Sequence, residues 1–342
     1  TGYDQSTVHV FALKRTLAPT LALVADIVTR PAFSEADAQR VHADRMANLE
    51  LKPDRPREVA DDVLSGALFG PDSAYGHPGD GVAASFAQVT RVDAQTFYAN
   101  HWAPARMTLV VAGDVTEAEL MPLLQSSLGA WRHPAPRTPN VRVARSADPA
   151  RLLLVDRPGA PQADVRVGLR GIVRNDSRYA KLRVLTNLLG GSFTSRLNNR
   201  LREQLGYTYG ARALSDTRRW AGTFTISTAL FTPKVVDGIS EIRQMLAKLR
   251  TPDYPALELD KAKQNLIRDL PSQFETLDDT TNAFADLAQN GLPLNWYARY
   301  AKELASTSAQ DLQRLARTLI RDRDLCYVVV GDLAAVRAGL EA

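Results

Sequence analysis

The chain has 342 residues, of which 45% are apolar and 23% are charged, and its formal net charge is +4. This composition is globular and the length allows two domains with separate cores, so a disordered chain is excluded. The 42 basic and 38 acidic residues are scattered rather than grouped, and we therefore expect no nucleic-acid partner. Apolar runs such as Met107 to Ala112 stop short of the roughly 20 residues of a membrane helix, so we expect no membrane insertion.

The single cysteine, Cys326, lies in the apolar run Leu325 to Val330, which favours a buried strand residue over a reactive thiol. One cysteine excludes a disulfide framework and a cysteine-based zinc site. The sequence opens without a charged segment followed by an apolar one, so its start does not indicate a compartment.

The first part of the chain predicts helices and one strand. An amphipathic helix begins at Leu17-Ala18-Pro19, and Ser34 with Asp37 predicts the cap of a helix over 35–52. Residues 90–115 predict a capped helix followed by a buried strand, 107–112, that ends at Gly113-Asp114. Three prolines in His133 to Asn140 then disfavour helix and central strand.

The second part predicts a mixed sheet with helices on one side. A helix over 178–189 closes at Gly190-Gly191, and a second helix over 194–204 carries an apolar stripe and ends at Gly206. The remaining elements are strands over 151–155, 163–169, 207–213 and 222–230, then helices over 235–249, 255–269 and 273–290.

The two parts resemble each other when the chain is shifted against itself. A shift of 218 places Asp93 on Asp311 and Gly113-Asp114 on Gly331-Asp332, and a shift of 214 places Leu17-Ala18-Pro19 on Phe231-Thr232-Pro233. Two matches in the same order indicate tandem duplication, with roughly 65 residues of the second copy, about 151 to 214, having no counterpart in the first. The alternative is that both halves merely share a common pattern. We predict an α+β fold with an N-terminally incomplete domain over 1–135, a linker over 136–150, and a complete domain over 151–342.

The most specific segment is Leu189 to Tyr209, LGGSFTSRLNNRLREQLGYTY. Its glycines, its Ser-Arg-Leu, and its Arg and Tyr seven residues apart resemble the second-half signature of the M16 superfamily of zinc peptidases (pitrilysin, insulinase and mitochondrial processing peptidase), closest to the M16B-like branch. Thr1-Gly2 with Asp4, Tyr75-Gly76 and the strand ending in Gly-Asp support this resemblance. The resemblance implies that Arg202 and Tyr209 reach toward a zinc site and hold the scissile peptide.

The chemistry of these two residue types fits that role. A guanidinium donates to peptide carbonyls, and a phenol hydroxyl donates to the oxygen that becomes negative in a tetrahedral intermediate. Without the resemblance, a solvated arginine and a packed tyrosine are the ordinary interpretation. Tyr207 shares a strand face with Tyr209 by alternation, and the seven-residue spacing favours Tyr209.

The chain departs from the peptide-cutting members of that superfamily, which carry His-x-x-Glu-His. Its five histidines are never closer than 24 residues, so we expect them to be surface, loop or cap residues. Aligning Pro56 with the family's proline places Asn48 at the downstream ligand position, and Glu50 lies two residues away on a different helix face. We therefore expect no metal or other cofactor in this chain, and zinc in a partner subunit.

Three hypotheses remain open. The first is a metal-free subunit that pairs with a homologous zinc-binding subunit in a heterodimer, closes the substrate chamber and supplies Arg202 and Tyr209 for hydrolysis of peptides. In family members an extended peptide adds to a sheet edge. The second is a scaffold subunit without a peptidase role, and the third is a complete peptidase whose zinc segment precedes this sequence. Family habit favours the bacterial periplasm, with the cytoplasm as the alternative.

Overall fold

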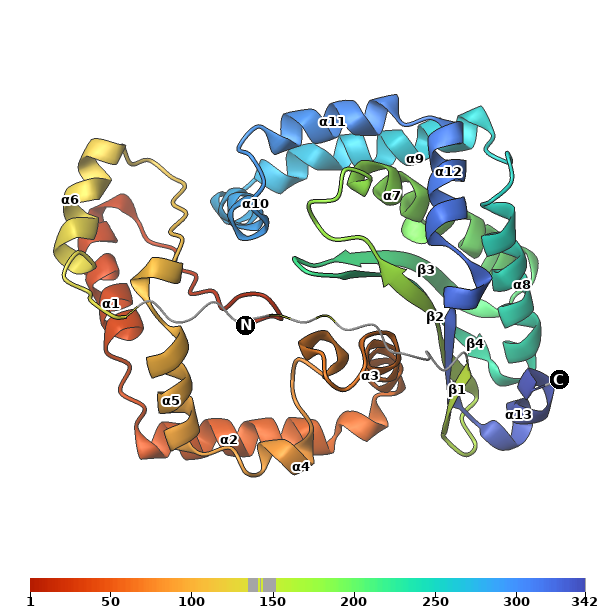
Figure 1. Ribbon diagram of the computed structural model, residues 1–342, viewed down its shortest axis with the longest axis horizontal. Coiled ribbons are helices and arrows are strands. Elements are labelled where there is room, and N and C mark those ends of the chain that lie inside the picture. The colour runs from red at the N-terminus through yellow and green to blue at the C-terminus, as the bar shows by residue number, and fades with distance from the viewer. Residues whose placement is uncertain (135–140, 142, 144–151, 342) are drawn as a thin grey trace. The chain divides into compact units, whose positions relative to one another are not determined.

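The computed structural model describes residues 1–134, 141, 143 and 152–341, and Figure 1 traces them in chain order. Their contacts define two compact units, each built from separate stretches of sequence. The helical unit comprises Thr1–Leu51, Asp80–Asn140 and Gln273–Ala288, and the sheet unit comprises Lys52–Gly79, Val141–Ser272 and Gln289–Ala342. The predicted linker over 136–150 falls outside the described residues except for 141 and 143, and the boundary between sequence copies stays a prediction.

The helical unit confirms the helices predicted for the first part of the chain. Ser34 Oγ accepts a hydrogen bond from the backbone N–H of Asp37, and Thr90 and Asp93 form a reciprocal capping box. Such caps satisfy backbone donors that a helix start leaves free. The helices of this unit are α1 (Leu17–Thr29), α2 (Glu35–Glu50), α4 (Ala83–Phe86), α5 (Arg91–His101), α6 (Glu117–Ser127) and most of α10 (Leu277–Asn290).

The strand predicted over 107–112 is wrong. The segment follows α5 as expected, but it pairs with no strand in the part of the chain that the structure describes, where every strand belongs to the sheet unit. A strand exists only through hydrogen bonds to a neighbour, so an apolar alternation without a partner stays irregular. Leu109 and Val111 are accordingly 45% and 40% exposed, whereas Val328 and Val329, at the matching place in the second part, are fully buried.

The sheet unit holds a five-stranded mixed sheet in the order β1-β5-β2-β4-β3. Strands β1 and β5 are parallel, and all other neighbours are antiparallel. The strands are β1 (Leu152–Asp156), β2 (Gln162–Gly171), β3 (Thr208–Thr217), β4 (Gly222–Phe231) and β5 (Cys326–Gly331). This confirms the predicted fold class, and the buried Cys326 confirms the strand predicted around it.

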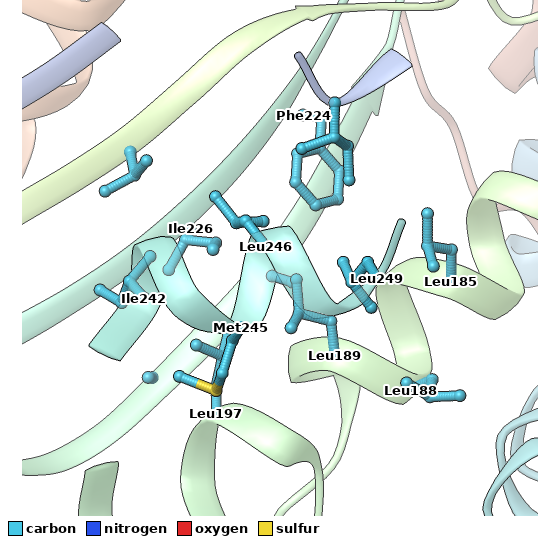
Figure 2. Packing of buried hydrophobic residues seen from close by; sticks show 14 of the residues in the cluster. Leu185, Leu188, Leu189, Leu197, Phe224, Ile226, Ile242, Met245, Leu246 and Leu249 are labelled. Carbon is cyan, nitrogen blue, oxygen red and sulfur yellow. The ribbon is translucent and has the colours of Figure 1, made fainter. Parts of the chain in front are cut away.

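One face of the sheet packs on helices and forms the larger core. Alternate residues of β2, such as Val165 and Val167, point to this face because strand side chains alternate. Figure 2 shows Leu189 and Leu197 packed in this core near Met245 and Leu246. Each fully buried leucine contributes about 1.5–3 kcal/mol. The helices of this unit other than α3 are α7 (Tyr179–Thr186), α8 (Val235–Lys248), α9 (Ala256–Asp269), α11 (Trp296–Ser306), α12 (Ala309–Leu319) and α13 (Leu333–Glu341).

The opposite face is covered by α3 (Pro56–Phe69), so the expectation of helices on one side only is wrong. The other alternation of the strands is also apolar, with Cys326, Val328 and Val330 packed against Leu64 and its neighbours. Gly168 leaves room for this packing, because a Cβ there would lie 2.7 Å from Leu64 Cδ2 and the leucine side chain would have to move.

A buried arginine fixes α3 on the sheet. The Arg166 side chain of β2 is 1% exposed, and its Nε donates to Asp61 Oδ1 of α3 at 2.6 Å. Its Nη2 donates to the backbone oxygen of Arg57 at 3.0 Å, and Nη1 lies 3.4 Å from Asp164. A buried guanidinium requires such partners, so this contact specifies where α3 docks.

Candidate functional site

Arg202 lies on a short π-helical segment, η6 (Asn198–Gln204), that follows two α-helical residues, Arg196 and Leu197. Leu197 and Leu201 are fully buried and anchor the segment in the larger core, as the predicted apolar stripe requires. A π-helical turn holds one more residue than an α-helical turn and occurs frequently at functional sites.

Two arginines tie this segment to the helices behind it. Arg196 makes two contacts of 2.7 Å with Glu258 of α9, and Arg200 makes two of 2.8 Å with Glu241 of α8. The Arg200 guanidinium holds the pKa of the Glu241 carboxyl below its ordinary value. Bidentate pairs of this kind fix orientation as well as distance. The backbone that carries Arg202 is therefore well constrained.

Arg202 itself has no such bidentate pair within the described residues. Its guanidinium carbon lies 4.0 Å from the centre of the Phe193 ring, and its Nε lies 3.5 Å from the carboxylate of the adjacent Glu203. The side chain is 34% exposed. A cation–π contact orients the planar group without using its N–H donors, and the ion pair with Glu203 involves Nε, which leaves the N–H groups of the two Nη atoms able to bind a ligand carbonyl.

Tyr209 lies on a β-bulge at the start of β3. The pairing of β3 with β4 shifts between Thr208 and Ala211, so that Tyr209 and Gly210 interrupt the ladder. Thr208 Oγ1 accepts from the Gly210 N–H at 3.0 Å, and Thr228 Oγ1 of β4 donates to the Gly210 oxygen at 3.0 Å. Bulges redirect side chains. Tyr209 is 77% exposed, and its ring rests edge-on against Phe231, with centroids 5.4 Å apart.

Tyr207 lies in a different setting, which separates the two tyrosines that alternation places on one face. It precedes β3, its ring packs on the larger core, and Lys234 Nζ lies 5.3 Å from the ring centre. Its backbone N–H donates to the Leu201 oxygen at 2.8 Å and closes the end of η6. Tyr207 therefore stabilises the turn between η6 and β3, whereas the Tyr209 side chain is exposed to solvent.

The corner between Arg202 and Tyr209 forms as predicted. Gly206 has a φ of +62° and ends η6 by a backbone bond to the Arg202 oxygen, which is the conformation that favours glycine. Both residues lie in the sheet unit. Among the described contacts, none joins the two side chains to each other. Their joint role on a peptide stays a prediction.

Sequence reasoning missed two residues at this corner. Phe193 supports the Arg202 guanidinium, and Asn198, which is 7% exposed, bonds to the backbone of β3 through its side-chain oxygen. One signal in the sequence could have identified Asn198: it directly follows Leu197, on a helix whose inward positions are otherwise apolar. Gly190, predicted as a close-approach turn, is confirmed, since a Cβ there would lie 2.1 Å from the Ala213 nitrogen.

Among the residues that the structure describes, there is no group of three histidine, cysteine, aspartate or glutamate side chains that could hold a metal ion. At the position aligned with the family's downstream ligand, Asn48 donates a hydrogen bond from its side-chain amide to the Asp44 backbone oxygen at 2.8 Å.

None of the helices that the structure describes is long and apolar enough to cross a membrane.

Comparison with known proteins identifies the family. Residues 88–266, slightly more than half of the chain, match the family described as "Peptidase M16 inactive domain". The chain belongs to this family. The matched range includes the π-helical segment η6 and the bulge of β3, so Arg202 and Tyr209 both lie within it.

Individual relatives agree with this M16 assignment. An uncharacterized zinc protease of Mycobacterium bovis is 25% identical over 328 residues, which cover 94% of this chain and 74% of the relative. The mitochondrial-processing peptidase subunit beta of Blastocladiella emersonii is 22% identical over 349 residues, with coverages of 97% and 72%. The crystal structure of a peptidase M16 inactive domain from Pseudomonas fluorescens superposes with a TM-score of 0.83 at 22% identity, over 92% of this chain and 75% of that one. The M16 family resemblance inferred from the sequence is thereby confirmed.

Proposed function

We propose that this chain is the non-metal-binding subunit of a heteromeric zinc peptidase. In this proposal a homologous subunit holds the zinc and the attacking water, and the M16 chain described here closes the substrate chamber. Its membership of the inactive-domain family supports the non-catalytic assignment. The similarity to a protein named as a subunit of mitochondrial-processing peptidase supports the heteromeric one.

The observation that carries the proposal is the state of Arg202 and Tyr209. Arg202 keeps the donors of its two Nη atoms while its contact with the Phe193 ring orients the guanidinium. Tyr209 lies on a bulge that the side chains of Thr208, Thr228 and Asn198 hold by hydrogen bonds. Donors placed in advance at the positions where charge develops stabilise a transition state without reorganisation. A guanidinium on the peptide carbonyls and a phenol on the forming oxyanion would together bind and orient an extended peptide.

The test is hydrolysis of a quenched fluorescent peptide by this chain mixed with the homologous subunit that carries His-x-x-Glu-His. Arg202→Ala and Tyr209→Phe should each lower kcat/KM by about 100-fold, the usual effect of removing one oxyanion-type donor. The matched controls are Arg212→Ala, an exposed arginine on the same strand, and Tyr207→Phe, and both should stay within about threefold of wild type.

Unchanged turnover with Arg202→Ala and Tyr209→Phe would remove the substrate-binding role. Turnover that does not depend on this chain at all would favour the scaffold subunit instead. Both outcomes are read in the same assay, so the comparison of variants with the chain-free control separates them.

A further inference from the structure

One buried amide connects the two elements that carry Arg202 and Tyr209. Asn198 is the first residue of η6, and Arg202 follows four residues later on the same segment. The Asn198 Oδ1 accepts a hydrogen bond from the backbone N–H of Ala211 at 2.9 Å, and Ala211 is the residue at which β3 resumes its pairing after the Tyr209 bulge. A single side chain therefore bridges the helix of one group and the strand of the other.

The two N–H donors of this amide are also used. Its Nδ2 donates to the Ser192 backbone oxygen at 3.0 Å and to Ser195 Oγ at 3.3 Å. These two acceptors lie in the loop that carries Phe193, the ring beneath the Arg202 guanidinium. Because an amide offers one acceptor and two donors on one plane, its three contacts place loop, helix and strand at fixed positions relative to one another.

The other polar side chains of η6 make different connections. Asn199 is exposed and donates only to the Thr194 oxygen of the loop, at 3.0 Å. Arg200 binds Glu241 of α8 and Gln204 of the same segment. Within the described contacts, Asn198 alone of these side chains reaches β3. Asn199 is thus a neighbour of identical chemistry that lacks the bridge.

We propose that Asn198 is the positioning residue that holds Arg202 and Tyr209 at the separation required to grip one peptide. The inference rests on the proposed function of the pair, and it adds the device that sets its geometry. The residue touches neither substrate nor reacting atoms. It acts by holding the bulge of β3 and the segment η6 at fixed positions relative to each other, so its loss uncouples two groups that remain chemically intact. Misplacement of about 1 Å is enough to cost a catalytic group about 100-fold.

The catalytic arm of the test is a double-mutant cycle in the assembly of this chain with its zinc-bearing homologue. Tyr209→Phe should lower kcat/KM by about 100-fold in the wild-type background and in Asn199→Leu, but by less than about threefold in Asn198→Leu. A merely structural role for Asn198 would lower overall activity and leave the full effect of Tyr209→Phe in place. That result would overturn the proposal.

The second arm needs no peptidase activity and is measured on this chain alone. Amide hydrogen exchange at Ala211 should be at least about tenfold faster in Asn198→Leu than in wild type or Asn199→Leu, because the N–H loses its acceptor. Unchanged exchange at Ala211 would overturn the bridge even if the proposed function holds. If no assembly hydrolyses peptide, the proposed function and the catalytic part of this proposal both fail, while this arm still decides the positioning link.

A rescue variant covers the case in which Asn198→Leu does not fold. Asn198→Asp keeps the acceptor for the Ala211 N–H and loses the two donors to the loop. It should retain the protection of Ala211 and the sensitivity to Tyr209→Phe while loosening the loop at Ser192. Loss of Ala211 protection in Asn198→Asp would contradict the assignment of that bond.

Discussion

Replacing Gly190 by alanine is a severe perturbation of the candidate site that needs no ligand to measure. A Cβ at Gly190 would lie 2.1 Å from the Ala213 nitrogen of β3 and 2.8 Å from Leu197 Cδ1. The first of these neighbours is backbone and cannot rotate away, so β3 and the π-helical segment Asn187–Gly191, which contains Gly190, must separate. Gly191 is the matched control, since the three atoms nearest to its Cβ would all belong to the Asn187 side chain, at 2.9 Å or more.

The magnitude follows from the geometry. Overpacking a filled core costs typically 1–3 kcal/mol, and a contact with backbone at this distance places Gly190→Ala at the upper end, about 3 kcal/mol. With a urea m-value of about 2–3 kcal/mol/M, the unfolding midpoint of the sheet unit should fall by about 1 M. Gly191→Ala should shift it by less than about 0.3 M, the effect of an adjustable side-chain neighbour.

The assay is urea unfolding followed by the fluorescence of Trp220 and Trp296, both in the sheet unit, after replacement of Trp102 and Trp131 by phenylalanine. Equal midpoints for Gly190→Ala and Gly191→Ala would refute the close-approach account. A large shift for Gly190→Ala alone would confirm that β3 and the segment Asn187–Gly191 pack directly on each other.

Further predictions concern the other face of the sheet, the thiol and a helix cap. Arg166→Ala should destabilise the sheet unit by about 3–5 kcal/mol and speed amide exchange in α3, because it removes the buried positive charge that pairs with Asp61 and Asp164. The control is Arg57→Ala, which should change the stability little because the Arg57 side chain is 77% exposed. Burial raises the pKa of the Cys326 thiol to about 11, so a disulfide reagent at pH 8 should label it only after unfolding; fast labelling of the native chain would contradict this burial. The same raised pKa contributes stability that is present below pH 9 and lost as pH rises toward 11, so Cys326→Ala should show a shallower loss of unfolding free energy over that range. Ser308→Ala, which removes the capping box of α12, should cost about 1 kcal/mol in urea unfolding.

Local chemistry explains what the sequence could predict. The caps at Ser34 and Thr90 depend on residues three apart, and both formed; the structure shows the same arrangement at Ser308. The glycine stop at Gly206 is local in the same sense. Apolar alternation located β2 and β5, because each of these strands has neighbours on both sides. The segment over 107–112 carries the same signal and failed, since no described strand pairs with it.

Features that depend on residues distant in sequence could not be predicted. The burial of Arg166 requires Asp61, which lies 105 residues earlier, and nothing near either residue announces the contact. The bulge at Tyr209 depends on Thr228 and on Asn198, so a strict alternation from Tyr207 assigned both tyrosines to one face. Arg202 and Tyr209 were identified as candidate site residues by the resemblance of the motif to the M16 family. The structure adds the residues that orient them, such as Phe193 and Asn198.

The central claim is that peptide hydrolysis requires this chain together with a homologous zinc subunit. The most direct measurement is the rate of peptide hydrolysis as this chain is titrated into a fixed amount of that subunit, with each chain alone as a control. The account predicts negligible hydrolysis by either chain alone and a rise that saturates at one chain per zinc subunit. Full activity of the zinc subunit alone, or chelator-sensitive hydrolysis by this chain alone, would contradict it.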